Sequence, residues 1–151
     1  MDQSVTGAGI ICYYDNREGK LNIDYKKDIL YLILQSEDGK YDFPKGGIDE
    51  GEKVKQCAFR ETYEECNLDS FDFEEVSKDY ISCGEGLCLF IGKIKEEIMI
   101  EPEKTIKIKM NEKTKIFEHK DFFFMTKEEA TQNLYNYLVK PLEKADKIIR
   151  K

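Results

Sequence analysis

The feature that most constrains the fold is a continuous apolar run, Ile29–Leu34 (ILYLIL). A half-exposed strand alternates apolar and polar residues, whereas a short unbroken run is typical of a strand covered on both faces. The polar turn sequence of Ser36–Lys40 (SEDGK) then ends it. The run therefore predicts a central strand in a sheet that has other elements packed against each face.

The segment after this strand changes to the spacing of a helix. Val54, Cys57 and Ala58 recur at i, i+3 and i+4, with charged residues between them. This spacing predicts a helix over Lys53–Glu65 with one buried face.

The remaining segments predict further strands and a helical C-terminal region. Thr126–Glu129 (TKEE) has the form of a capping box, which begins a helix that runs to about Lys140. Pro141 ends that helix or starts another, and Leu142–Lys151 is predicted to be helical. One domain, residues 1–151, is expected, with a mixed α/β (α+β) sandwich fold. The other predicted strands are Gly7–Tyr14, Tyr41–Phe43, Tyr80–Cys83, Leu87–Ile94, Thr105–Met110 and Asp121–Met125, and Asp15–Lys27 is expected to be a surface loop.

Charge and composition narrow the class of protein. The net charge of −7 argues against a DNA-binding protein, although the lysines of 104–115 and of the C-terminus could meet an anionic substrate. No stretch approaches the roughly 20 apolar residues that span a bilayer, and Met1–Ser4 does not read as a signal peptide. Five cysteines without paired CxxC units indicate reduced thiols. A cytoplasmic protein without membrane contact is expected.

The predicted helix carries an unusual group of acidic residues. Glu61 lies above both Glu64 (i+3) and Glu65 (i+4), so three carboxylates share one face. Like charges at these spacings destabilise a helix, and Arg60 supplies only part of the compensation. Divalent cations such as Mg²⁺ prefer oxygen ligands and also bind substrate phosphates. The pattern therefore favours a metal site, while a solvated acidic face is the alternative.

The loop before the helix places these acids in a longer pattern. From Gly46 the chain reads Gly, five residues, Glu52, seven residues, then Arg60-Glu61-Thr62-x-Glu64-Glu65-x-Asn67-Leu68. This resembles the box of the Nudix hydrolase family, Gly-x5-Glu-x7-Arg-Glu-U-x-Glu-Glu-x-Gly-U, where U is a bulky aliphatic residue. Every spacing and every charged position agrees.

Two positions depart from the family pattern. Thr62 stands where the family has an aliphatic residue, but it is β-branched and similar in volume to Val. Asn67 replaces the second glycine just past the helix end, where a left-handed backbone is usual and Asn is tolerated. Neither departure removes a charge, so neither puts catalysis in doubt.

The resemblance implies a Nudix-like α/β/α sandwich with a mixed central sheet, and it implies roles for individual residues. In the family such a site holds Mg²⁺ or Mn²⁺ and hydrolyses a phosphoanhydride bond with water. A later loop glutamate often joins as a ligand or general base, for which Glu118 is the best-placed candidate and Glu112 a rival. The implied metal ligands are Glu61, Glu64, Glu65 and the carbonyl of Gly46, with Glu52 orienting Arg60.

The lead-in Phe43-Pro44-Lys45-Gly46 bears on the substrate. It resembles two Nudix branches, the messenger RNA decapping domain and the dinucleoside tetraphosphate hydrolases, and diphosphoinositol polyphosphate hydrolases are a third reading. Capped RNA, a dinucleoside polyphosphate and an inositol pyrophosphate therefore stay open, as does an inactive Nudix domain that binds only nucleotide or protein. Candidate substrate contacts are Lys45 for phosphate and Tyr41 and Phe43 for stacking; His119 is expected to be incidental.

Overall fold

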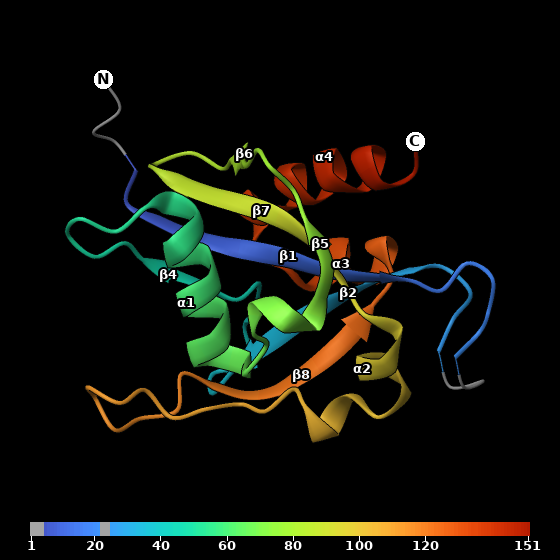
Figure 1. Ribbon diagram of the computed structural model, residues 1–151, viewed down its shortest axis with the longest axis horizontal. Helices are drawn as coiled ribbons and strands as arrows, with labels where there is room; N and C mark the ends of the chain where they lie inside the picture. Colours follow the sequence, from blue (N-terminus) through green and yellow to red (C-terminus); the bar gives the residue numbers. More distant parts are fainter. Residues whose placement is uncertain (1–4, 22–24) are drawn as a thin grey trace.

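A computed structural model describes residues 5–21 and 25–151, and its centre is an eight-stranded mixed sheet (Figure 1). The central strand β1 pairs in parallel with β7 and antiparallel with β2 and β4. The strands are β1 (Gly7–Asp15), β2 (Ile29–Ser36), β3 (Tyr41–Asp42), β4 (Lys45–Gly47), β5 (Phe73–Val76), β6 (Ile81–Ser82), β7 (Leu87–Ile94) and β8 (His119–Met125).

Helices cover both faces of this sheet. The α-helices are α1 (Val54–Cys66), α2 (Glu96–Ile100), α3 (Lys127–Asn133) and α4 (Val139–Ile149), joined by the short 3₁₀ helices η1 (Ser70–Asp72), η2 (Pro102–Lys104) and η3 (Asn136–Leu138). No helix among the described residues is long and apolar enough to cross a membrane.

The alternation of side chains in β1 explains why two layers form. Ile10 and Cys12 pack with Cys57 and Ala58 of α1, whereas Ile11 packs with the apolar residues of α3 and α4 on the other face. Both sets are fully buried. The chain therefore forms the predicted α/β/α sandwich with a mixed central sheet (Figure 1).

The apolar run Ile29–Leu34 lies in β2 as predicted. Each of its residues is at most 2% exposed, because α3 and α4 cover one face and the α1-side core covers the other. β2 also pairs with β1, β3 and β8, so its backbone groups are hydrogen-bonded along both edges. Burial on both faces is the physical reason for the unbroken apolar sequence.

The predicted strand Thr105–Met110 is wrong. Its alternation does bury Ile106, but the segment packs against the C-terminal end of α1, where Lys107 N–H donates to Cys66 C=O at 3.0 Å. Met110 forms only an isolated bridge with Phe117. Alternating apolar residues show that one face of the segment is buried. Here that face is buried against the end of α1 and not within a sheet.

The predicted helix from Lys127 to about Lys140 is interrupted. Its capping box is confirmed, since Thr126 Oγ1 accepts from Glu129 N–H at 3.2 Å. The helix ends at Asn133, because Leu134 takes an extended backbone and bridges Tyr41 of β3. α4 then begins at Val139, with Pro141 in the first turn, where a missing N–H costs nothing. Short elements that the sequence did not predict are β4, β5 and α2.

Two further expectations concern loops and cysteines. The described parts of Asp15–Lys27 are mostly turns and bends, and residues 22–24 of that predicted loop lie outside the described residues. All five cysteines are free thiols, as predicted. Cys83 and Cys88 pack against the cores on opposite faces of the sheet.

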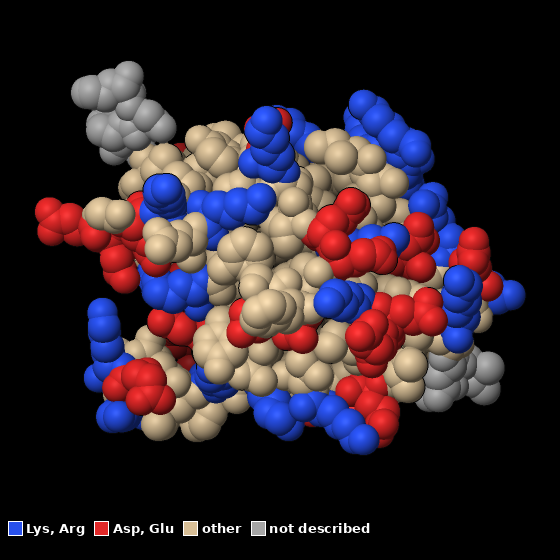
Figure 2. Space-filling view, in the orientation of Figure 1, with Lys and Arg blue, Asp and Glu red and all other residues tan. Residues whose placement is uncertain are grey.

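Acidic and basic side chains are interspersed over the face shown in Figure 2. Several lysines of the 104–115 segment have individual partners: Lys104 Nζ lies 3.0 Å from Glu101, and Lys109 Nζ lies 3.6 Å from the ring centre of Tyr63. The predicted basic segment therefore has part of its charge engaged locally.

Candidate active site

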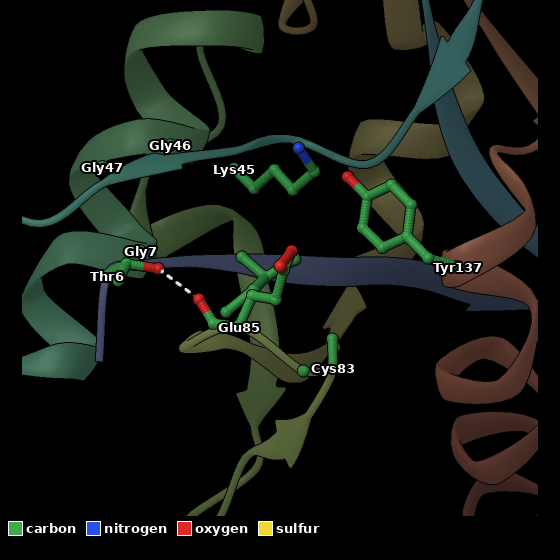
Figure 3. A pocket seen from close by; sticks show the side chains of 10 residues that line it. Thr6, Gly7, Lys45, Gly46, Gly47, Cys83, Glu85 and Tyr137 are labelled. Carbon is green, nitrogen blue, oxygen red and sulfur yellow. Dashed lines mark hydrogen bonds between the residues drawn. The ribbon is translucent and has the colours of Figure 1, made fainter. Parts of the chain in front are cut away.

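The short strand β4 separates two sides of the site. Successive residues of a strand point to opposite faces, so Lys45 points toward a cleft with Tyr137 (Figure 3), and Gly46 faces α1. A Cβ atom at Gly46 would overlap the carboxyl group of Glu61. Only glycine lets β4 approach the acidic face of α1 this closely.

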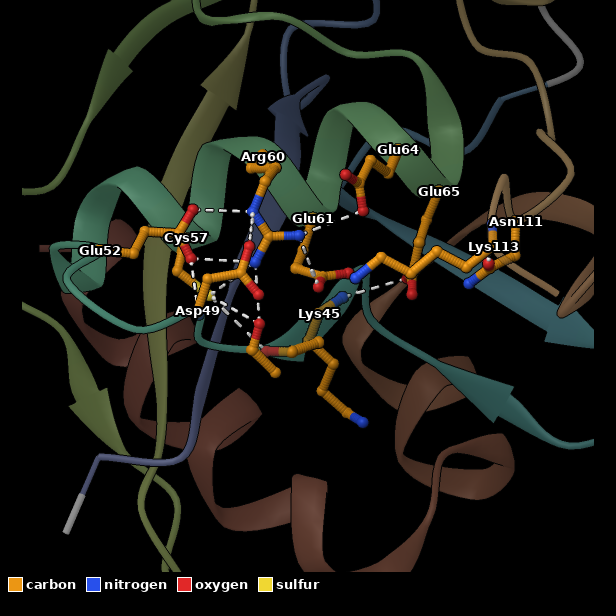
Figure 4. A network of polar contacts seen from close by, with 12 residues as sticks. Lys45, Asp49, Glu52, Cys57, Arg60, Glu61, Glu64, Glu65, Asn111 and Lys113 are labelled. Atoms are coloured by element: carbon orange, nitrogen blue, oxygen red, sulfur yellow. Dashed lines mark hydrogen bonds and ion pairs between the residues drawn. The ribbon is translucent and has the colours of Figure 1, made fainter.

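Arg60 connects the acidic residues of the loop and the helix (Figure 4). Its Nε and one terminal nitrogen donate to the two oxygens of Glu52, at 2.7 and 2.9 Å. The other terminal nitrogen donates to Glu61 at 3.0 Å and to Glu64 at 3.2 Å. The guanidinium lowers the pKa of Glu52 to about 2. The paired Glu52 thus fixes Arg60, and Arg60 in turn holds two of the three helix carboxylates.

Glu61 and Glu65 are largely removed from water. Burial raises the pKa of Glu65 to about 9, and the nearby charge of Glu61 adds to this effect. Burial likewise raises the pKa of Glu61, against the opposing effect of Arg60. The backbone N–H of Lys45 donates to the Glu65 carboxylate at 3.1 Å. Arg60 compensates the charge of Glu61, but these two adjacent buried carboxylates still form a place where a further cation would be stabilised.

The loop glutamates differ in position. The charge of Glu118 contributes, after burial, to the raised pKa of both Glu61 and Glu65, so Glu118 lies on their side of the molecule. Its carboxylate accepts from Asn111 Nδ2 at 3.4 Å. Glu112 instead lies 3.7 Å from Lys115. The structure therefore brings Glu118 toward the helix acids and gives Glu112 a different partner.

His119 is not the loop residue that the sequence indicated. It is the first residue of β8 and is 8% exposed, and burial lowers its pKa.

These residues suit a divalent cation in donor chemistry. Glu61 and Glu65 offer oxygen ligands in a partly buried site, and Glu64, which is 54% exposed, reaches the same side through Arg60. Among the described residues, however, no group of three or more acidic, His or Cys side chains is already gathered around one point. Ligation of one cation by all three glutamates would therefore require their side chains to move from these positions.

The carbonyl of Gly46 takes a different direction from the one expected. Its oxygen lies close to Gly7 of β1 and 3.7 Å from Cys57 Sγ, within the β1–β4 pairing. Its role as a ligand stays a prediction.

On the other side of β4 lies a cleft of about 590 Å³ (Figure 3). Lys45 Nζ is held there 3.1 Å from Asp42, and 5.9 Å from the ring centre of Tyr137. Burial disfavours the charged lysine, but Asp42 and Tyr137 outweigh it and raise the pKa of Lys45. The cleft therefore presents a fixed ammonium group. Its other lining residues include Thr6, Cys83, Glu85 and Leu87.

The two aromatic residues that were predicted to contact the substrate, Tyr41 and Phe43, lie in different environments. Phe43 is fully buried in the core against α3 and α4, so its expected stacking on substrate is wrong. Tyr41 is half-buried and packs against Phe123, with ring centres 6.1 Å apart. The aromatic residue that lines the cleft is Tyr137, which the sequence did not single out because it falls within the predicted continuous helix. Asp42 and Glu85 were also missed, since neither belongs to the box.

Comparison with known proteins bears on the family and the fold of the chain. A family model of the NUDIX domain matches residues 7–134. No curated protein matches the sequence. The fold is similar to an Ap4A hydrolase of C. elegans solved as a binary complex (TM-score 0.68, 20% identity, 97% of this chain and 98% of that chain).

Two other solved structures share the fold. One is a Nudix hydrolase of Listeria monocytogenes (TM-score 0.65, 16% identity, 96% and 94% of the two chains). The other is dihydroneopterin triphosphate pyrophosphohydrolase of E. coli (TM-score 0.59, 16% identity, 96% and 95%).

Proposed function

This chain belongs to the NUDIX domain family as a pyrophosphohydrolase, and we propose that it uses Mg²⁺ or Mn²⁺ to hydrolyse a phosphoanhydride bond in a nucleoside diphosphate linked to another moiety. One observation carries this proposal. The buried carboxylates of Glu61 and Glu65 on α1 lie directly against β4, and Gly46 is what allows β4 to come this close. The phosphates would lie between these acids and the Lys45 ammonium.

The chain's own residues have separate tasks in this reaction. A bound divalent cation would lower the pKa of an attacking water and neutralise phosphate charge. Glu61, Glu64 and Glu65 would hold it, and Glu52 keeps Arg60 in place beside them. Lys45 would bind a phosphate oxygen from the cleft side. Glu118 would accept the proton of the attacking water.

A dinucleoside polyphosphate is the substrate that we favour. The C. elegans protein that shares the fold over nearly its whole length is an Ap4A hydrolase. Capped RNA is the competing substrate, because the Phe43-Pro44-Lys45-Gly46 lead-in resembles both branches. An inositol pyrophosphate is less well matched, since Lys45 is the one cationic side chain among the described residues that line the cleft.

Substitution of Glu64 by Gln tests the reaction. We expect kcat with Mg²⁺ to fall by about 100-fold or more, and EDTA to abolish the wild-type activity. Glu97→Gln, on the exposed surface of α2, is the matched control and should retain activity. Unchanged activity in Glu64→Gln would overturn the metal-site assignment.

The substrate is tested by parallel assays with Ap4A, capped RNA and diphosphoinositol polyphosphates. We expect Ap4A to be cleaved with the highest kcat/KM among the three. Preferential release of 7-methyl-GDP would support decapping instead. Cleavage of inositol pyrophosphates alone would rule out both nucleotide substrates.

A further inference from the structure

The turn between β6 and β7 forms one wall of the cleft and has an unusual backbone. Gly84, Glu85 and Gly86 all have positive φ, at 87°, 51° and 84°. Such values are uncommon for a residue with a side chain and persist only where the surroundings hold them. Thr6 does this here: its Oγ1 donates to Glu85 C=O at 2.8 Å, and its N–H donates to Gly86 C=O at 2.9 Å.

This turn directs the Glu85 side chain into the cleft. Figure 3 shows its carboxylate extending from the turn toward the side where Lys45 and Tyr137 lie. Among the residues that the structure describes, no side chain forms an ion pair or hydrogen bond with this carboxylate. Thr6 holds the backbone of the turn, and the exposed Glu85 carboxylate at the cleft is therefore available to a ligand.

Tyr137 provides the facing surface. It projects from η3, is 50% exposed, and lines the same cleft. Tyr135 supports it with a ring centre 5.9 Å away. Tyrosine rings in such positions stack with nucleobases in a way that tolerates different bases, so the stack by itself does not select one.

On the basis of the function proposed above, we propose that Glu85 selects a guanine base that stacks on Tyr137. An ionised carboxylate only accepts hydrogen bonds. The Watson–Crick edge of guanine carries two adjacent donors, N1–H and the N2 amino group, which fit the two carboxylate oxygens. Adenine offers one amino donor beside the N1 acceptor, which would face a carboxylate oxygen. From this base the phosphates would run past Lys45 to Gly46 and the acids of α1.

Nucleotide binding to the metal-free protein tests the base site without any hydrolysis. We expect GDP to bind about tenfold or more tightly than ADP in titration calorimetry. Glu85→Gln should remove this preference, because an amide presents one donor and one acceptor. Tyr137→Leu should weaken both nucleotides while keeping their ratio. Glu97→Gln should leave the ratio and both affinities unchanged.

Hydrolysis with Mg²⁺ separates this proposal from the proposed reaction. Wild type should cleave diguanosine tetraphosphate with a higher kcat/KM than Ap4A, and Glu85→Gln should reduce that ratio about tenfold. Equal use of both compounds by wild type, with no effect of Glu85→Gln, would overturn guanine selection and leave the reaction standing. Selective binding of GDP without cleavage of any dinucleotide would refute the reaction and support the base site.

Discussion

At the scale of single residues, burial changes the chemistry of the site more than residue type does. Glu61 and Glu65 are both acidic residues of one helix face, but the burial of Glu65 raises its pKa to about 9. Glu64 on the same face is 54% exposed. The three glutamates of the box therefore lie in different environments.

The raised pKa of Glu65 predicts a pH-dependent stability of the metal-free protein. The unfolded chain loses this proton near the ordinary value of 4.5, whereas the folded protein keeps it to about pH 9. The stabilisation from Glu65 is therefore complete below about 4.5 and is lost as the pH rises toward 9. Glu65→Gln should raise the melting temperature in EDTA at pH 8 by about 3 °C or more.

Thermal unfolding of both proteins between pH 4 and 9 checks this expectation, and the difference between them should grow with pH. Glu64→Gln is the matched control and should shift the melting temperature less, because its side chain is more exposed. A Glu65→Gln protein that melts below wild type at pH 8 would contradict the prediction.

At the scale of elements, Asn67 helps to fix the C-terminal end of α1. Asn67 has φ 70° and donates through its backbone N–H to Tyr63 C=O, at 2.9 Å, as expected for a left-handed helix end. Its side chain adds a bond that glycine could not make, from Nδ2 to Thr105 C=O at 3.0 Å. The departure from the family glycine therefore ties α1 to the segment that leads toward Glu118.

Asn67→Ala should lower the free energy of unfolding by about 2 kcal/mol, because alanine is strained in this conformation and the bond to Thr105 is lost. Asn67→Gly loses the bond but relieves the strain, so its stability should lie between those of Asn67→Ala and wild type. Urea unfolding monitored by circular dichroism measures both differences. Equal stability of Asn67→Ala and wild type would show that the helix end is not held in this way.

At the scale of the whole molecule, a polar network that is buried at Tyr31 and Asp146 joins the C-terminal helix to the central sheet. Tyr31 of β2 donates to Asp146 of α4 at 2.6 Å, and Arg150 bonds both Asp146 and Asp28, at 2.7 and 2.8 Å. Tyr31 and Asp146 lie 115 positions apart in the chain, and Asp28 and Arg150 lie 122 positions apart. The network therefore closes the layer opposite α1 without contributing to the acidic site.

Tyr31→Phe should lower the free energy of unfolding by about 2 kcal/mol, since it removes a buried hydrogen bond to a charged group and keeps the ring. Its kcat should equal that of wild type. Urea midpoints at constant m-value give the stability change. Tyr135→Phe, at a partly exposed ring, is the control and should change stability little; a similar loss in both variants would argue against a specific role for the network.

The sequence by itself determined those features that depend on residues close together in the chain. The unbroken run in β2, the helix of α1, the capping box at Thr126 and the spacing from Gly46 to Leu68 all follow from periods and turns within the chain. Such signals depend on contacts over a few positions, which the sequence records directly. The reaction class was accessible for the same reason, because the box places its charges within one loop and one helix.

Only the tertiary structure determined which residues surround the Gly46–Leu68 segment. Thr105–Met110 has a strand-like alternation but meets a helix end, and Phe43 is aromatic beside the site but is buried in the core. The cleft is assembled from Thr6, the Glu85 turn and Tyr137, which come from distant parts of the chain. Burial and partner choice depend on which segments the fold brings together. The acids of α1 thus identify the reaction from sequence, while the surroundings that would select a substrate exist only in the folded molecule.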